Sequence, residues 1–140
     1  MMDTFERLRS LVTPDLLARC FSKQVDCDEV LDDRDLPEFE ENWLRVYTQL
    51  EQMKSRSPLG EGKKQLLDQV REDVYKGVFS LTEAPEVAGA VSDDFGLICT
   101  AALVDFSDDW LNALWAAYRD GTIPTSQLDP IPGSLGDLVP

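Results

Sequence analysis

The clearest repeat of hydrophobic positions lies near the middle of the chain. Six apolar residues follow one another there at intervals of three or four: Leu36, Phe39, Trp43, Val46, Leu50 and Met53. This spacing places them on one face of an α-helix. Because the pattern lasts less than three heptads, it predicts a helix of a small bundle rather than a long coiled coil.

A second apolar stripe follows after a short break. Segment 55–62 is dense in turn-forming residues and should end the first helix. The second stripe predicts a helix over residues 63–79, with these positions on one face: Leu66, Leu67, Val70, Val74 and Val78. Because the connection is short, we expect the two helices to form an antiparallel hairpin.

Helix-start signals divide the rest of the chain. Residues 3–12 show helical spacing, and Thr13 followed by Pro14 predicts a new helix capped by the threonine hydroxyl. A further helical stretch is expected over 84–91. Two similar sequences then occur fifteen residues apart, Ser92-Asp93-Asp94-Phe95 and Ser107-Asp108-Asp109-Trp110, and each is interpreted as a helix start in which a hydroxyl caps the backbone and acids face the helix dipole.

The end of the chain has a different composition. Gly121 suits the C-terminal cap of the helix that holds Trp110, Trp115 and Tyr118. Residues 121–140 contain four prolines and three glycines and predict an extended tail without regular structure, either mobile or laid over the bundle. The prediction is therefore an all-α fold. It comprises one helical domain over 1–120, a bundle of about five to six helices with an antiparallel hairpin, and a tail over 121–140.

The helix of Trp110 and Tyr118 carries apolar residues over most of its circumference. Such a helix either lies at the centre of a bundle or meets a partner. We favour the central position. Trp43 could be an anchor for a partner, but its place in the apolar stripe of its helix makes us expect a core residue first.

Acidic residues are concentrated in residues 26–41. This segment holds nine acids and a single base, Arg34. We expect its first part to be a loop or irregular segment, with Asp35 as the N-cap of the helix that follows. The segment is either a solvated surface or a docking surface for a basic protein.

The whole chain of 140 residues carries a formal net charge of −14, from 27 acids and 13 bases. Such a charge disfavours nucleic acid and anionic membranes as partners, because both are polyanions. It favours a basic protein partner, although many proteins are acidic for solubility alone.

The residues needed for common catalytic sites are missing from the sequence. The chain has no histidine, the commonest general base and metal ligand, and its three cysteines, Cys20, Cys27 and Cys99, lack metal-binding spacing. We expect a binding protein rather than an enzyme, with no cofactor and no metal site. Free cysteines, the absence of a signal-peptide pattern and the absence of long apolar runs predict a cytoplasmic location.

Residues 91–124 carry a resemblance. The segment VSDDFGLICTAALVDFSDDWLNALWAAYRDGTIP combines the Ser92-Asp93-Asp94 start, a small-residue helix, a tryptophan-rich stretch and a Gly121-to-Pro124 close. It resembles the C-terminal part of immunity proteins that accompany bacterial polymorphic toxins, including those of contact-dependent inhibition and Rhs systems. The resemblance implies a cytosolic antidote that binds a toxin domain one to one and blocks its active site or substrate path.

Many toxins of this kind are nucleases with basic grooves, so an acidic antidote would match its target. The first choice of contact residues comes from the acidic segment: Asp28, Glu29, Asp32, Asp33 and Asp35. The second choice comes from the two helix starts: Asp93, Asp94, Asp108 and Asp109. Two alternatives remain open at this point, an acidic secretion chaperone or adaptor that mixes strands with helices, and an enzyme that uses carboxylates and a metal.

Overall fold

The computed structural model describes residues 2–140, and this part of the chain contains eight helices and no strand. The predicted all-α fold is confirmed, with more helices than the five to six expected. The helices are α1 Thr4–Leu11, α2 Pro14–Cys20, α3 Cys27–Arg34, α4 Pro37–Arg56, α5 Glu61–Thr82, α6 Pro85–Leu103, α7 Asp109–Arg119 and α8 Leu135–Leu138.

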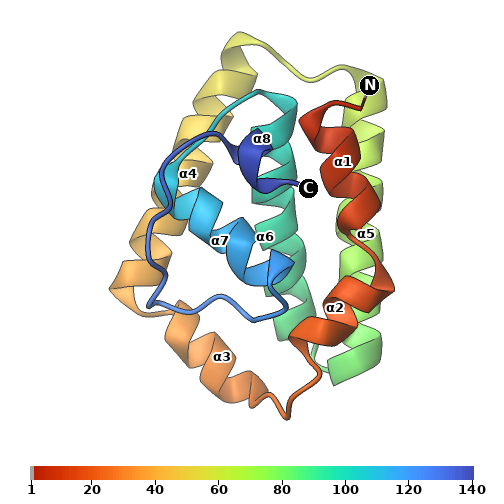
Figure 1. Ribbon diagram of the computed structural model, residues 1–140, viewed down its shortest axis with the longest axis vertical. Coiled ribbons are helices and arrows are strands. Elements are labelled where there is room, and N and C mark those ends of the chain that lie inside the picture. The colour runs from red at the N-terminus through yellow and green to blue at the C-terminus, as the bar shows by residue number, and fades with distance from the viewer. Residues whose placement is uncertain (1) are drawn as a thin grey trace.

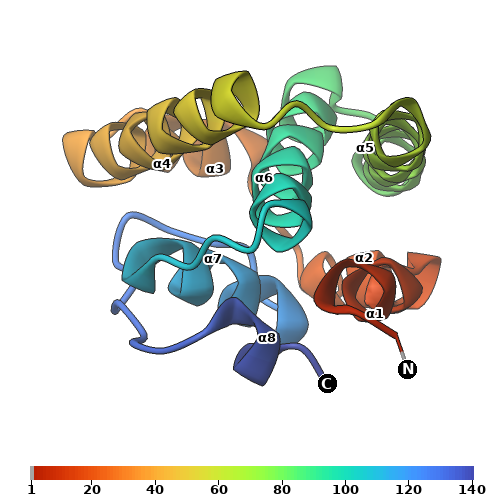
Figure 2. The ribbon, with the colours of Figure 1, turned by 90° about the horizontal axis from the view of Figure 1, so that it is seen from above.

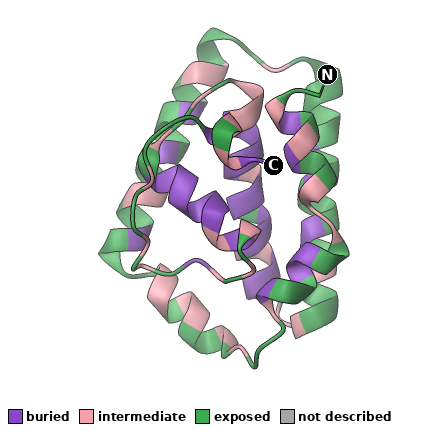
Figure 3. Ribbon diagram, viewed as in Figure 1, coloured by how far each residue is buried: buried purple, intermediate pink, exposed green. Residues whose placement is uncertain are grey.

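Helix α6 runs through the middle of the molecule (Figures 1 and 2). In Figure 2, α4 and α5 lie on either side of α6, and α7, α1 and α2 lie below it. The purple segments of Figure 3 show that buried residues concentrate on α6 and α7. In α7 every residue from Trp110 to Ala116 is buried, as is Tyr118, which confirms the predicted central position of this helix.

The helical hairpin is formed by a different pair of helices from the one predicted. Helix α5 packs along α6, whereas α4 packs on α6 from the other side and not chiefly on α5. A connection of a few residues makes α4 and α5 run in opposite directions, but it does not force them into contact. The strongly apolar α6 separates them because it has more surface to bury than either neighbour.

The acidic segment is mostly helical, which corrects the expected loop. Helix α3 begins after Asp26, whose side chain accepts the backbone N–H of Glu29 at 3.1 Å. Asp35 is the C-cap of α3, and the N-cap of α4 is Leu36 with Pro37 as the first helical residue. None of the α3 residues is buried, so the hydrophobic pattern gave no signal for this helix.

The two Ser-Asp-Asp sequences behave differently. Ser107-Asp108-Asp109 does precede a helix, with Asp108 as the N-cap that accepts the N–H of Leu111 at 3.0 Å. Ser92-Asp93-Asp94 lies inside α6, which continues without a break from Pro85, so the predicted helix start there is wrong. Ser92 is buried and donates its hydroxyl to the carbonyl of Arg71 on α5.

A buried carboxylate ties four helices together. Asp94 on α6 has no exposed surface, and each of its two oxygens accepts two hydrogen bonds. Arg34 of α3 donates a hydrogen bond to Asp94 from each of its two terminal nitrogens, at 2.9 Å and 2.7 Å. The indole N–H of Trp43 on α4 lies at 3.0 Å and the hydroxyl of Tyr118 on α7 at 2.6 Å. We call these four residues the Asp94 hub.

The groups of the Asp94 hub are held in defined charge states. Burial alone would lower the pKa of Arg34, but the charge and hydrogen bonds of Asp94 raise it above its ordinary value. Burial, and then the neighbouring negative charge of Asp94, raise the pKa of Tyr118 well above 10. The charged guanidinium of Arg34 and the neutral phenol of Tyr118 thus share one buried acceptor, Asp94, which leaves neither of its oxygens without a partner.

The last twenty residues pack onto the bundle. The side-chain amide of Asn112 donates to the carbonyls of Ile131 and Gly133, each at 2.9 Å, and the indole of Trp115 donates to the carbonyl of Leu138 at 3.0 Å. Leu135 is 2% exposed and begins α8, a short helix that the composition of the tail did not predict. Gly121 has φ of 80° and caps α7 as expected, because only glycine adopts this left-handed region freely.

The Asp94 hub predicts that substitutions at two adjacent residues, Asp93 and Asp94, have very different effects on the free energy of unfolding. Asp94→Asn should lower the free energy of unfolding by about 3 kcal/mol, because the buried charge of Arg34 loses its counterion. The matched control is Asp93→Asn, which removes only an exposed ion pair and should cost less than about 1 kcal/mol. Urea unfolding of the two variants measures both values, and equal losses would contradict the structural role of Asp94.

The phenol of Tyr118 predicts a dependence of stability on alkaline pH. Because its pKa is raised in the fold, the unfolded chain releases this proton first and stability falls as pH rises above about 10. Tyr118→Phe should cost about 1–2 kcal/mol at pH 7 through the lost hydrogen bond, yet decline less steeply than wild type between pH 10 and 11.

Unfolding in urea at a series of pH values tests this, with the half-exposed Tyr75→Phe as the control. Part of the alkaline loss should remain in the Tyr118→Phe variant, because burial also raises the pKa of Cys20 to about 11 and of Cys99 to about 12. Parallel pH curves for wild type and Tyr118→Phe would contradict the prediction.

The packing of the tail predicts that Leu135→Ala costs about 2–4 kcal/mol of stability, as for other buried leucines. Leu81→Ala is the control, since Leu81 is 48% exposed and should change stability by less than about 0.5 kcal/mol. Thermal and urea unfolding provide the comparison, and a tail that did not contribute to the fold would make the two variants alike.

Candidate partner-binding surface

The nine acids selected from the sequence fall into two groups in the structure. Four have partners within the protein. Asp94 is the buried centre of the hub, and Asp33 accepts both the N–H and the hydroxyl of Ser126, at 2.7 Å and 2.9 Å, so it holds the tail. Asp108 caps α7 and pairs with Arg45 at 2.6 Å, and Asp93 pairs with Arg71 at 2.7 Å. These four carboxylates have structural roles that the sequence did not reveal.

The environment of Asp108 lowers its pKa. Burial would raise its pKa, but the hydrogen bonds from Arg45 and from the backbone N–H of Leu111, together with the charge of Arg45, lower it below the ordinary value. Asp108 is therefore ionised and committed to two structural contacts. Asp109, the next residue, is exposed and its side chain has no hydrogen bond or ion pair within residues 2–140.

The remaining four acids lie on or beside α3 and point to solvent. Asp28, Glu29, Asp32 and Asp35 are all exposed, and their carboxylates form no side-chain hydrogen bond or ion pair among the described residues. Glu38, Glu40 and Glu41, in the first turns of α4, are exposed as well, and Glu40 borders the same hollow as Asp35. We call these seven residues the acidic face. The one base of the segment, Arg34, is turned inward to Asp94 and is only 12% exposed.

Helix α3 has no buried residue, so its position depends on a few polar and partly buried contacts. Arg34 links α3 to α6 through Asp94, and its guanidinium lies 4.3 Å from the ring centre of Phe39 on α4. Leu31 and Cys27 add partly buried apolar contacts with the core. These contacts fix the direction in which the acidic face points.

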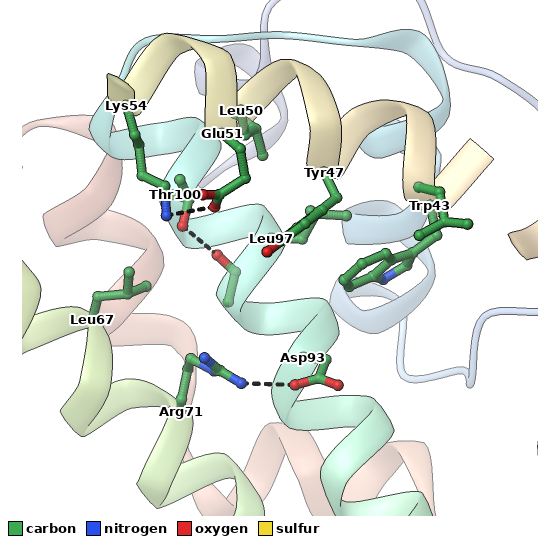
Figure 4. A pocket seen from close by; sticks show the side chains of 12 residues that line it. Trp43, Tyr47, Leu50, Glu51, Lys54, Leu67, Arg71, Asp93, Leu97 and Thr100 are labelled. Atoms are coloured by element: carbon green, nitrogen blue, oxygen red, sulfur yellow. Dashed lines mark hydrogen bonds and ion pairs between the residues drawn. The ribbon is translucent and has the colours of Figure 1, made fainter. Parts of the chain in front are cut away.

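A groove lies next to the acidic face. Its walls are α4 and α5, its floor is α6, and its volume is about 550 Å³. Figure 4 shows Trp43, Tyr47 and Leu50 reaching it from α4, with Arg71 on the opposite wall. A second hollow of about 250 Å³ adjoins it and contains Asp35 and Glu40. Both hollows are lined by Trp43, Leu44 and Asp93, so they are neighbours on the surface.

The sequence analysis missed the exposed apolar residues of this groove. Leu44 is 50% exposed and Tyr47 is 44% exposed, and the ring of Tyr47 stacks on that of Trp43 with centroids 5.4 Å apart. Leu44 and Tyr47 fall outside the apolar stripe that defined this helix. That departure from the stripe was the available signal, because an apolar residue on the polar face of a helix has no core to enter.

Residues 2–140 contain neither a metal-binding cluster nor a membrane-spanning helix. That part of the chain has no group of three or more cysteine and acidic side chains placed to hold a metal ion. None of its helices is both long enough and apolar enough to span a membrane. Cys20 and Cys99 are buried and Cys27 is partly buried, all as free thiols.

Comparison with known proteins adds a family to this geometry. No curated protein matches the chain. The family model described as immunity protein PIM1 matches residues 7–125, which extends well beyond the segment 91–124 that carried the resemblance and takes in α3, α4 and the groove. The acidic face and its supporting hub thus lie within the matched region, and the chain belongs to the PIM1 immunity protein family.

Proposed function

We propose that this protein neutralises a cognate toxin domain by binding it through the acidic face and covering its active site or substrate path. The observation that supports this most directly is the set of exposed carboxylates on and beside α3 that have no partner within residues 2–140. In a member of an immunity protein family, such a set fits a contact with a basic protein.

Electrostatics favours a toxin domain with a basic, nuclease-like groove. The protein has a net charge of −14, and part of it lies on the exposed carboxylates on and beside α3. Opposite charges on two proteins raise the rate of encounter and orient the partners before contact. A row of carboxylates also presents negative charge where a nucleic-acid backbone would lie, so it would compete with such a substrate. We propose a complex of one copy with one toxin domain.

The acids are not equivalent as contact residues. Asp28, Glu29, Asp32 and Asp35 form the centre of the proposed contact because their carboxylates are unpaired. Asp33 lies beside them but is engaged with Ser126, so a substitution there would release the tail as well as remove a charge. Asp93 and Asp109 are exposed and can contribute at the margin, whereas Asp94 is buried and cannot reach a partner in this conformation.

The alternative of a secretion chaperone is weakened by the fold. The sequence analysis expected such a protein to mix strands with helices, and residues 2–140 contain helices alone. Membership of an immunity protein family points in the same direction.

The proposal predicts that reversing two charges of the acidic face weakens binding. Asp28→Lys combined with Asp32→Lys should reduce the affinity for the toxin domain at least about tenfold at low salt, and the loss should shrink near 0.5 M salt because screening removes the attraction. Calorimetry with the C-terminal domain encoded by the neighbouring toxin gene measures this effect, together with survival of cells that express both proteins.

The control reverses the same number of charges elsewhere. Asp15 lies in the first turn of α2, as Asp28 does in α3, and Asp129 is an exposed tail residue. Asp15→Lys with Asp129→Lys should leave the affinity within about threefold of wild type, because only the overall charge changes. The proposed function fails if the wild-type protein neither binds the toxin domain nor protects the cells.

A further inference from the structure

Resting on the proposed function, we infer that the groove between α4 and α5 is the apolar centre of the toxin contact. Its occupant is a segment of the toxin domain with an aliphatic or aromatic side chain next to a lysine or arginine. The apolar side chain lies against Leu44 and Tyr47, and the basic side chain points toward Asp35 and Glu40.

The shape of the groove admits a protruding segment. The larger hollow, which reaches Lys54 and Glu51, and the smaller one, which reaches Asp35 and Glu40, are neighbours, and we treat them together as one depression that a partner would meet. Its floor on α6 includes Gly96, which has no side chain, and Thr100, whose side chain is small, so the floor stays low between the two walls. The acidic end of this depression is continuous with the acidic face, so one partner can contact both.

Large apolar side chains are exposed in the groove on α4 and, beyond the groove, on α5. On α4, Leu44 and Tyr47 are about half exposed beside Trp43. On α5, Tyr75 and Phe79 follow the groove residue Arg71 at intervals of four, which places all three on one side of that helix. Their rings stack with centroids 6.3 Å apart and are 38% and 42% exposed. Tyrosine and tryptophan are the residues that most often dominate the energy of protein interfaces.

Charge complementarity identifies the chemistry of the occupant. The bases that line the two hollows are all matched, Lys54 with Glu51, Arg71 with Asp93 and Arg34 with Asp94, each at 2.7 Å. Asp35 and Glu40 at the other end form no ion pair within residues 2–140. The groove is thus electrically balanced at one end and negative at the other, so a segment with a basic residue at the α3 end satisfies it. Phosphate-bearing partners would be repelled there.

The groove is also rigid at its centre, which favours binding. The indole of Trp43 is held by its hydrogen bond to Asp94, and Tyr47 stacks on the indole. An aromatic surface that is already ordered loses little conformational entropy when a partner binds. The Asp94 hub thus positions the apolar contact as well as the acidic face.

The first experiment compares two leucines of equal exposure. Leu44→Ser removes a groove contact at a residue 50% exposed, and Leu81→Ser alters a residue 48% exposed at the end of α5. Calorimetry with the toxin domain of the neighbouring gene should show about 30-fold weaker binding for Leu44→Ser, with a similar loss at low and high salt, and less than about threefold for Leu81→Ser. Tyr47→Ala should behave like Leu44→Ser, and circular dichroism should show all three variants folded.

The second experiment tests the orientation of the segment. Glu40→Lys should weaken binding about tenfold at low salt, whereas Lys54→Glu at the balanced end should not weaken it. Equal losses from the two reversals would overturn the assigned orientation.

The outcomes separate this inference from the proposed function. If wild type binds the toxin domain and the Asp28/Asp32 reversal weakens it while Leu44→Ser and Tyr47→Ala do not, the groove inference is wrong and the proposed function stands. If wild type does not bind, the proposed function itself fails. Light scattering of the protein alone provides a further test, since a dimer that Leu44→Ser dissociates would identify a second copy as the occupant and overturn the inference.

Discussion

The fold depends on one buried carboxylate and the three side chains that neutralise and hydrogen-bond it. Asp94 lies in the most apolar helix of the protein, where an unpaired charge would cost several kcal/mol. Arg34, Trp43 and Tyr118 come from three other helices and are each tens of residues distant in the chain. Because a single carboxylate accepts from all of them, α3, α4 and α7 can take only one arrangement around α6. A buried ion pair adds little net stability, and its effect here is to select that arrangement.

The same hub determines what the surface presents. Arg34 is the only base in the acidic segment, and turning it inward leaves the segment without an exposed cation. Trp43 is drawn toward Asp94, which leaves Leu44 and Tyr47 on the outer side of α4 beside it. A charged helix and an apolar groove therefore lie side by side because both are anchored to one residue. In this member of the PIM1 family, the Asp94 hub therefore positions both the interior helices and the candidate interface.

The sequence predicted those features of the fold that depend on neighbouring residues. Thr13, Pro14 and Gly121 act within one turn of chain, and the apolar stripes of α4 and α5 follow from helical spacing alone, so these elements were found. Helix α3 was missed because it buries no residue, although Asp26 caps it in the ordinary way. Ser92 to Asp94 looked like a helix start because serine and aspartate favour that position. The continuation of the apolar stripe from Val87 and Val91 to Phe95 and Ile98 was the signal for an unbroken helix.

The candidate site was predictable only in part, for a related reason. The sequence identified the acidic segment correctly as a concentration of charge, but it could not separate Asp32 from Asp33, since the partner of Asp33 is Ser126 in the distant tail. The role of Asp94 requires Arg34, sixty positions away, and no local pattern connects the two. Contacts between residues far apart in the chain therefore decide which carboxylates hold the fold together and which remain exposed to bind a partner.

Charge and apolar contact would act at different stages of the proposed complex. Long-range attraction from the acidic face affects mainly how fast a basic partner arrives, whereas burial of aromatic surface in the groove affects mainly how long it stays. With a net charge of −14, the carboxylates of the folded protein repel one another. A basic partner would reduce this repulsion. Binding and folding are then linked, because any partner that binds the folded state alone stabilises it. Helix α3 buries no residue and is anchored mainly by Arg34. A partner that binds the acidic face would therefore stabilise this helix more than other parts of the fold.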